Sequence, residues 1–231
     1  MSKRSPFPDS LLNQSGLNRQ AIFDVADLPE NIRNKLNTKS GQLILIGHGG
    51  RLLWEKVQAA NLCGSDPIDD FTIATIQRWF ADFLPGRHFQ ILYPGDQPIG
   101  LQALGKLAGW HQPSPFMVGI DSEWGSWFAY RAVVLADTNF QPTLAVDRNS
   151  PCVTCQSKDC ISNCPAGALD EANFSLPKCL AYRKLPDAKC HFTCLARVSC
   201  PVGSEHRYSA EQLHHTYSIS LRYITQNLVM K

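Results

Sequence analysis

Apolar residues in the N-terminal half of the chain recur with two different periods. In Arg51–Leu62 and Asp69–Phe83 they stand three or four positions apart, which predicts two amphipathic helices. The short run Gln42–Gly47 is instead continuously apolar and ends in glycine, a pattern that predicts a buried strand. The second helix is expected to bury a stripe formed by Ile73, Ile76, Phe80 and Phe83.

Similar patterns continue to about residue 140. The first forty or so residues are predicted to be a polar lead-in with short helices, one of which begins near Pro29. Because strands and helices alternate, residues 1–140 are expected to form a layered α/β domain. Its further predicted elements are strands over His88–Tyr93, Phe116–Ile120 and Trp127–Ala136, and a helix over Leu101–Ala108.

A turn-rich, polar segment at residues 137–149 marks the predicted domain boundary. Residues 141–231 are expected to form a smaller, cysteine-rich module that ends in a helix over Ala210–Leu228. The predicted fold class is therefore α+β, with a layered N-terminal domain followed by a C-terminal module.

Composition and charge narrow the functional classes only slightly. The 231 residues carry a formal net charge of +2, so nucleic acid is not expected as a partner on electrostatic grounds. The longest apolar stretches fall far short of the ~20 residues that span a bilayer. The first ten residues also lack the apolar core of a secretory signal. We therefore expect a cytoplasmic protein with no membrane partner.

Cysteine is the unusual feature of the composition. The chain has nine cysteines, and all but Cys63 lie between Cys152 and Cys200. In a reducing cytoplasm, clustered thiols hold a metal more often than they form disulfides. Zinc and iron–sulfur clusters are therefore the two chemistries to weigh. Cys63 stands apart at the end of a predicted helix and is expected to be a buried, inert thiol.

The spacing of these cysteines favours iron–sulfur clusters over zinc. The bacterial two-cluster ferredoxin run is C-x2-C-x2-C-x3-C-P. The eight clustered cysteines of this chain form two runs, and each run keeps the Cys-Pro ending. Four-thiolate zinc sites, which remain the alternative, usually present separated C-x2-4-C knuckles and do not need the proline. The two runs are Cys152-x2-Cys155-x4-Cys160-x3-Cys164-Pro165 and Cys179-x10-Cys190-x3-Cys194-x5-Cys200-Pro201.

The Cys-Pro endings predict crossed ligation. Proline restricts the residue before it to an extended conformation, which helps to turn that thiolate away from the other three of its run. In two-cluster ferredoxins this last cysteine ligates the other cluster. We therefore predict two 4Fe–4S clusters as cofactors. The first ligand set is Cys152, Cys155, Cys160 and Cys200, and the second is Cys164, Cys179, Cys190 and Cys194.

The chain resembles the epoxyqueuosine reductases from Gly125-Ser126-Trp127 through both Cys-Pro endings, and upstream at Pro98 and Ala108-Gly109. That family pairs two 4Fe–4S clusters with a cobalamin bound in an α/β domain. The segments Ile46–Gly50 and Leu53-Trp54 are similar to the cobalamin-processing branch of the same superfamily. The resemblance implies a corrinoid-reductase-like N-terminal domain, a ferredoxin-type C-terminal domain, and cobalamin as a candidate cofactor.

Two departures from the family argue against the same activity. The family's glycine-rich G-x-G-W-x-G-K segment is replaced by Gly109–Pro115, which keeps only the first glycine in register. The family's proposed general acid, an aspartate three residues before the proline that matches Pro98, is here Gly95. The neighbouring Asp96 is expected to be a turn residue. We therefore expect a relative of the reductases with an unassigned substrate and unassigned catalytic residues.

Two classes of function remain open. The leading hypothesis is an iron–sulfur oxidoreductase or electron-transfer protein. Its clusters would relay electrons from an external donor of flavodoxin or ferredoxin type to a pocket in the N-terminal domain. The alternative is a non-catalytic binding or assembly factor whose clusters only stabilise the C-terminal fold. The cations between Lys178 and Arg207 are expected to offset the negative charge of thiolate-bound clusters.

Overall fold

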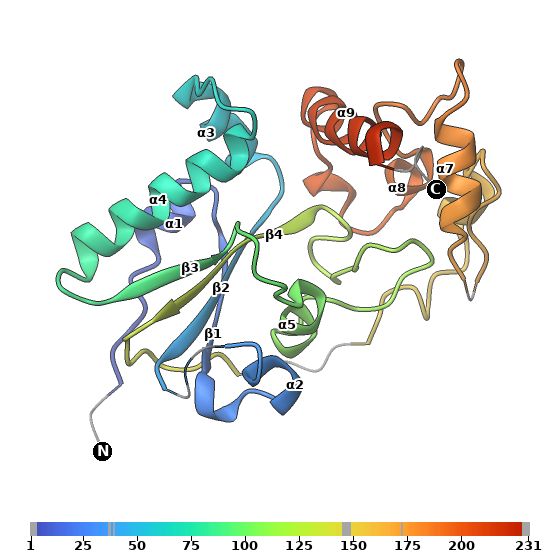
Figure 1. Cartoon of the computed structure of the whole chain (residues 1–231). Coiled ribbons are helices and arrows are strands. Elements are labelled where there is room, and N and C mark those ends of the chain that lie inside the picture. The colour runs from blue at the N-terminus through green and yellow to red at the C-terminus, as the bar shows by residue number, and fades with distance from the viewer. Residues whose placement is uncertain (1–3, 37, 39, 145–148, 172, 228–231) are drawn as a thin grey trace. The chain divides into compact units, whose positions relative to one another are not determined.

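The computed structural model describes residues 4–36, 38, 40–144, 149–171 and 173–227, and the chain divides into two compact units (Figure 1). The first unit comprises residues 1–110 and 128–147, and the second comprises residues 111–127 and 148–231. Each unit is therefore built from two separate stretches of the chain.

The first unit is a four-stranded antiparallel sheet with helices on both sides (Figure 1). The strands, in the spatial order β1-β2-β4-β3, are β1 (Arg19–Asp24), β2 (Gln42–Gly49), β3 (Phe89–Tyr93) and β4 (Phe128–Ala136). The helices are α1 (Ser10–Gln14), the 3-10 turn η1 (Val25–Asp27), α2 (Glu30–Arg33), α3 (Leu52–Ala60), α4 (Pro67–Phe83) and α5 (Leu101–Leu107). The predicted layered mixture of helices and strands is thus confirmed.

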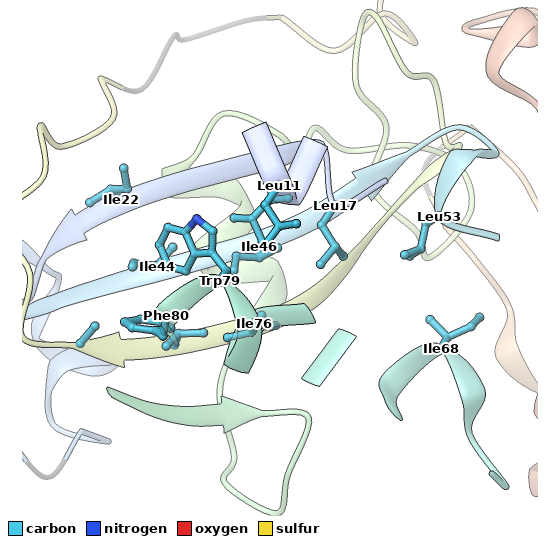
Figure 2. Close-up of a cluster of buried hydrophobic side chains, with 14 of the residues drawn as sticks. Leu11, Leu17, Ile22, Ile44, Ile46, Leu53, Ile68, Ile76, Trp79 and Phe80 are labelled. Atoms are coloured by element: carbon cyan, nitrogen blue, oxygen red, sulfur yellow. The ribbon is translucent and has the colours of Figure 1, made fainter. Parts of the chain in front are cut away.

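Strand β2 is the centre of this unit because both of its faces are covered. All of its residues are buried, which explains the unbroken apolar run in its sequence. Ile44 and Ile46 pack in the same hydrophobic core as Trp79 of α4 (Figure 2). Leu43 and Leu45 alternate with them and point to the opposite face, where they are also fully buried.

Two predictions about the strands were wrong. Strand β1, which pairs with β2 along its whole length, lies in the segment expected to be a helical lead-in. The sequence did not reveal this strand by an alternation of apolar and polar residues, because only two of its six residues are buried. Conversely, Phe116–Ile120 is not a strand. It lies in the second unit, where Ile120 forms only an isolated bridge with Gln112, and the preceding Pro113 and Pro115 lack the N–H groups that a ladder needs.

The buried face of α4 differs in part from the predicted stripe. Ile76 and Phe80 are buried as expected, whereas Phe83 is 42% exposed. Trp79, which the predicted stripe omits, is fully buried, and its Nε1 donates a hydrogen bond to the carbonyl oxygen of Pro8 at 2.6 Å. The contact with the sheet therefore follows a line through Ile68, Ile76 and Trp79 rather than one through Phe83 (Figure 2).

The second unit is built from short helices joined by loops. The helices are α6 (Asp159–Ser162), α7 (Leu176–Arg183), α8 (Leu195–Ser199), the 3-10 turn η2 (Ser204–His206) and α9 (Ala210–Asn227). Helix α9 confirms the predicted C-terminal helix over Ala210–Asn227. The last residue of the prediction, Leu228, lies outside the described residues. Among the helices described in either unit, none has the length and the hydrophobicity needed to cross a membrane.

Candidate metal centre

Each of the eight cysteines in the predicted ligand sets is a free thiol in the second unit. Cys160 lies in α6 and Cys179 lies in α7, while Cys194 and Cys200 flank α8 as its N-cap and C-cap residues. The backbone of Cys200 is extended, as expected for a residue before proline. The loops carry the remaining four: Cys152, Cys155, Cys164 and Cys190.

Four of these thiols interact as one electrostatic group. Burial is the main cause that raises the pKa of Cys160 to about 11, and the nearby thiols of Cys200, Cys152 and Cys155 also raise it. Burial raises the pKa of Cys200 as well, with further contributions from Cys152 and Cys155. Cys200 reaches the other three because α6 and α8 pack against each other. These four cysteines are the members of the first predicted set.

The other four thiols form a second group around a cavity. Burial is again the main cause that raises the pKa of Cys179, and Cys194, Cys164 and Cys190 raise it further. All four line a cavity of about 410 Å³, which none of the first four cysteines borders. The remaining lining is mostly apolar and comes from helices α7, α8 and α9 and from loops. These four cysteines are the members of the second predicted set.

Ligation itself stays a prediction. Within the described ranges, no group of three or more His, Cys, Asp or Glu side chains is arranged to hold a metal ion. The assignment therefore rests on the thiol chemistry, the two groups of four and the cavity. The prediction for Cys63 was wrong, because this thiol is exposed. It follows α3, whose C-cap residue Asn61 has a left-handed conformation, and the residues after that turn are exposed.

The segment Gly125–Trp127, on which much of the family resemblance rests, packs against the end of the second cysteine run. Gly125 has a φ of 58°, and a Cβ there would collide with the carbonyl oxygen of Val202. A Cβ at Gly203, where φ is 63°, would lie only 2.5 Å from the nitrogen of Gly125. Glycine at both positions therefore lets the two backbones meet, which holds the loop after Cys200 in place.

A group of polar residues around His48 lies in the first unit. His48 is fully buried and accepts a hydrogen bond at Nδ1 from Nε of Arg131, at 3.0 Å. Burial and the nearby Asp66 raise the pKa of Asp69, whereas Arg131 lowers it. Burial and Asp69 in turn raise the pKa of Tyr93. The signal that sequence reasoning missed was a single cation, Arg131, inside the apolar run of β4.

The pocket expected in the N-terminal domain stays a prediction. An open hollow of about 300 Å³ lies beside β3 and β4 in the first unit, lined in part by His88, Phe89 and Leu135. Its volume is at the lower end of the ~300–1,000 Å³ typical of small-molecule sites. Asp96 is exposed in a turn, as the sequence predicted.

Comparisons with known proteins find similarity in structure. No family model matches the sequence, and no curated protein matches it either. Epoxyqueuosine reductase from Streptococcus thermophilus has a TM-score of 0.51 and 14% identity, covering 84% of this chain and 65% of the reductase. Epoxyqueuosine reductase with an epoxyqueuosine-modified tRNA-Tyr stem loop has a TM-score of 0.54 and 12% identity, covering 89% and 68%. The C. elegans B12-trafficking protein CblC has a TM-score of 0.54 and 13% identity, covering 96% of both chains.

These similarities define a shared fold. At 14% identity or less, they show that the mixed α/β architecture with its four-stranded antiparallel sheet is related to the folds of epoxyqueuosine reductase and CblC. The chain spans 65% of the S. thermophilus reductase, which is less than two thirds of that protein. At this level of identity the similarity establishes the fold alone.

Proposed function

We propose that the chain is an iron–sulfur oxidoreductase or electron-transfer protein whose second unit is a ferredoxin-type module with two 4Fe–4S clusters. The main support is that the eight thiols fall into two groups of four, one of which lines a single cavity. A bound 4Fe–4S cluster supplies one-electron transfer. The proposed ligands are Cys152, Cys155, Cys160 and Cys200 for the first cluster, and Cys164, Cys179, Cys190 and Cys194 for the second.

The protein's own residues bind and shield these sites. Phe116, Ile120 and Leu169 are buried in one apolar cluster with cysteines of both groups, and this packing limits the access of water, one of the factors that set a cluster potential. Lys158 Nζ donates a hydrogen bond to the carbonyl oxygen of Cys152 at 2.9 Å and so steadies the loop of the first group. Val153 in that loop is 79% exposed, so we place the approach of a flavodoxin- or ferredoxin-type donor there.

Metal content and redox behaviour test this proposal. After anaerobic reconstitution with iron and sulfide, we expect ~8 iron atoms per chain, little zinc, and visible absorption that bleaches reversibly on one-electron reduction. Stoichiometric zinc in a colourless protein would contradict the cluster assignment. Eight iron atoms that cannot be reduced and reoxidised reversibly would instead favour the alternative, a binding or assembly factor with structural clusters.

The neighbours bear on two further parts of the proposal. One reductase was solved with a tRNA stem loop, which weighs against the expectation that nucleic acid is not a partner, so we withdraw that expectation. The neighbour that spans 96% of both chains is a B12-trafficking protein. This favours a second candidate function, binding of cobalamin by the first unit.

Cobalamin binding can be measured without knowing the reaction. Hydroxocobalamin added to the reconstituted protein is expected to co-elute with it on gel filtration at about one molecule per chain and to change its visible spectrum, since protein contacts alter the ligands of the cobalt. The same experiment with a small unrelated protein controls for non-specific retention. Free elution of all the cobalamin, with an unchanged spectrum, would contradict this second candidate.

A further inference from the structure

Two arginines border the cavity of the second cysteine group and are almost fully buried. The relative exposure of Arg183 is 6% and that of Arg197 is 8%, and both side chains line the cavity together with Cys164, Cys179 and Cys194. Burying a guanidinium is costly unless an anion or a dense set of hydrogen bonds compensates for the lost hydration. Their partners therefore decide what these cations do.

Among the described residues of the second unit, the hydrogen-bond partners of Arg183 are neutral. Its Nε donates to the carbonyl oxygen of Cys190 at 3.0 Å, and its Nη1 donates to Oγ of Ser220 at 3.0 Å. Its Nη2 donates to the carbonyl oxygens of Tyr217 at 3.1 Å and His191 at 3.4 Å. These bonds hold the guanidinium rigidly, and none of the described carboxylates forms an ion pair with it.

Arg197 is held in the same way. Its Nε donates to Oγ of Ser126 at 3.3 Å, and its Nη2 donates to the carbonyl oxygen of the same residue. Its guanidinium carbon lies 4.6 Å from the ring centre of Trp127 and 5.0 Å from that of Tyr208. Burial raises the pKa of Tyr217, which also contacts Arg197, to about 12, so this phenol is neutral at physiological pH.

The two charges thus lack a counter-ion in the described protein. None of the ion pairs between described residues includes Arg183 or Arg197. A cubane with four thiolate ligands carries net negative charge, and one-electron reduction makes that charge more negative. A cation held in a medium of low dielectric constant beside it favours the reduced state more than the oxidised state.

On the basis of the proposed function, we infer that Arg183 and Arg197 raise the reduction potential of the cluster in the second cysteine group and leave that of the first cluster largely unaffected. They are positioning residues that act on the cluster through their charge. With the clusters bound, a reduced donor of flavodoxin or ferredoxin type would lose one electron and the second cluster would gain it, with no bond broken and no proton transferred, and the two guanidinium groups would favour this reduced state. The second cluster would then be the one on which electrons collect.

The test is a redox titration of the reconstituted full-length protein, followed by the electron paramagnetic resonance of the reduced clusters. Cys155→Ala removes a ligand of the first cluster only and thereby identifies the signal of the second. In Arg183→Gln and in Arg197→Gln, the potential of the second cluster is expected to become more negative while that of the first stays unchanged. Lys184→Gln is the matched control, because it removes a neighbouring but exposed charge and should change neither potential.

Different outcomes of this experiment test the inference and the proposed function. Two intact clusters with unchanged potentials in both glutamine variants would overturn the inference, while the clusters themselves would still support the function. If both glutamine variants lose iron, the variants Arg183→Lys and Arg197→Lys separate the effect of the charge from that of packing and hydrogen bonds. Retention of both clusters in the lysine variants supports a role for the charge, whereas equal loss would show that the arginines act only through packing and hydrogen bonds. A wild-type protein without iron would contradict the function itself.

Discussion

Alanine at Cys200 is expected to remove about half of the iron that the wild-type protein binds, ~4 of ~8 atoms per chain, because one cubane loses a ligand. The double variant Cys155→Ala/Cys200→Ala should lose no more iron than either single variant, since both cysteines serve the first cluster. Cys155→Ala/Cys164→Ala should lose nearly all of it, because its two changes fall in different predicted sets. Iron analysis after identical reconstitution measures all four variants.

This comparison separates crossed from local ligation. If the four cysteines of the first run held one cluster by themselves, Cys155→Ala/Cys164→Ala would still retain the other cluster and about half of the iron. Cys63→Ala is the control for the loss of a thiol as such. Cys63 is exposed and belongs to neither group, so this variant should bind as much iron as the wild type.

A chain that ends at Lys189 is expected to assemble neither cluster. It keeps three ligands of the first set and two of the second, and it also loses α8 and α9, which complete the lining of the cavity. Because metal binding and folding are coupled in small metal-rich modules, the remainder of the second unit should lose its structure as well. Iron content and circular dichroism measure the two effects.

A full-length variant in which Cys190, Cys194 and Cys200 are all alanine separates ligand loss from loss of the fold. It keeps α8 and α9 but has the same remaining thiols as the shortened chain, so it should also bind no cluster with four cysteine ligands. One ordinary cluster in the shortened chain would show that Cys152, Cys155, Cys160 and Cys164 suffice, and the crossed sets would be wrong.

Local pattern was enough to predict most of the helices and the sheet of the first unit. The apolar run of β2 and the helical spacing in α3 and α4 are patterns that can be seen within the sequence of each element. Strand β1 escaped prediction because the edge of a sheet buries few of its side chains. The insertion of residues 111–127 into the second unit leaves no local signal at all, since it depends on contacts with segments far along the chain.

The sequence by itself determined the candidate chemistry: the number of thiols, their two runs and the proline after each last cysteine are all visible without a fold. Only the tertiary structure decided what surrounds those thiols. The sequence indicated that cations between Lys178 and Arg207 offset the charge of the clusters. Because cations are normally exposed, it did not indicate that Arg183 and Arg197 would be buried beside one group, held by neutral oxygens and rings. The association of His48 with Arg131 likewise depends on the pairing of β2 with β4, which joins residues 83 positions apart.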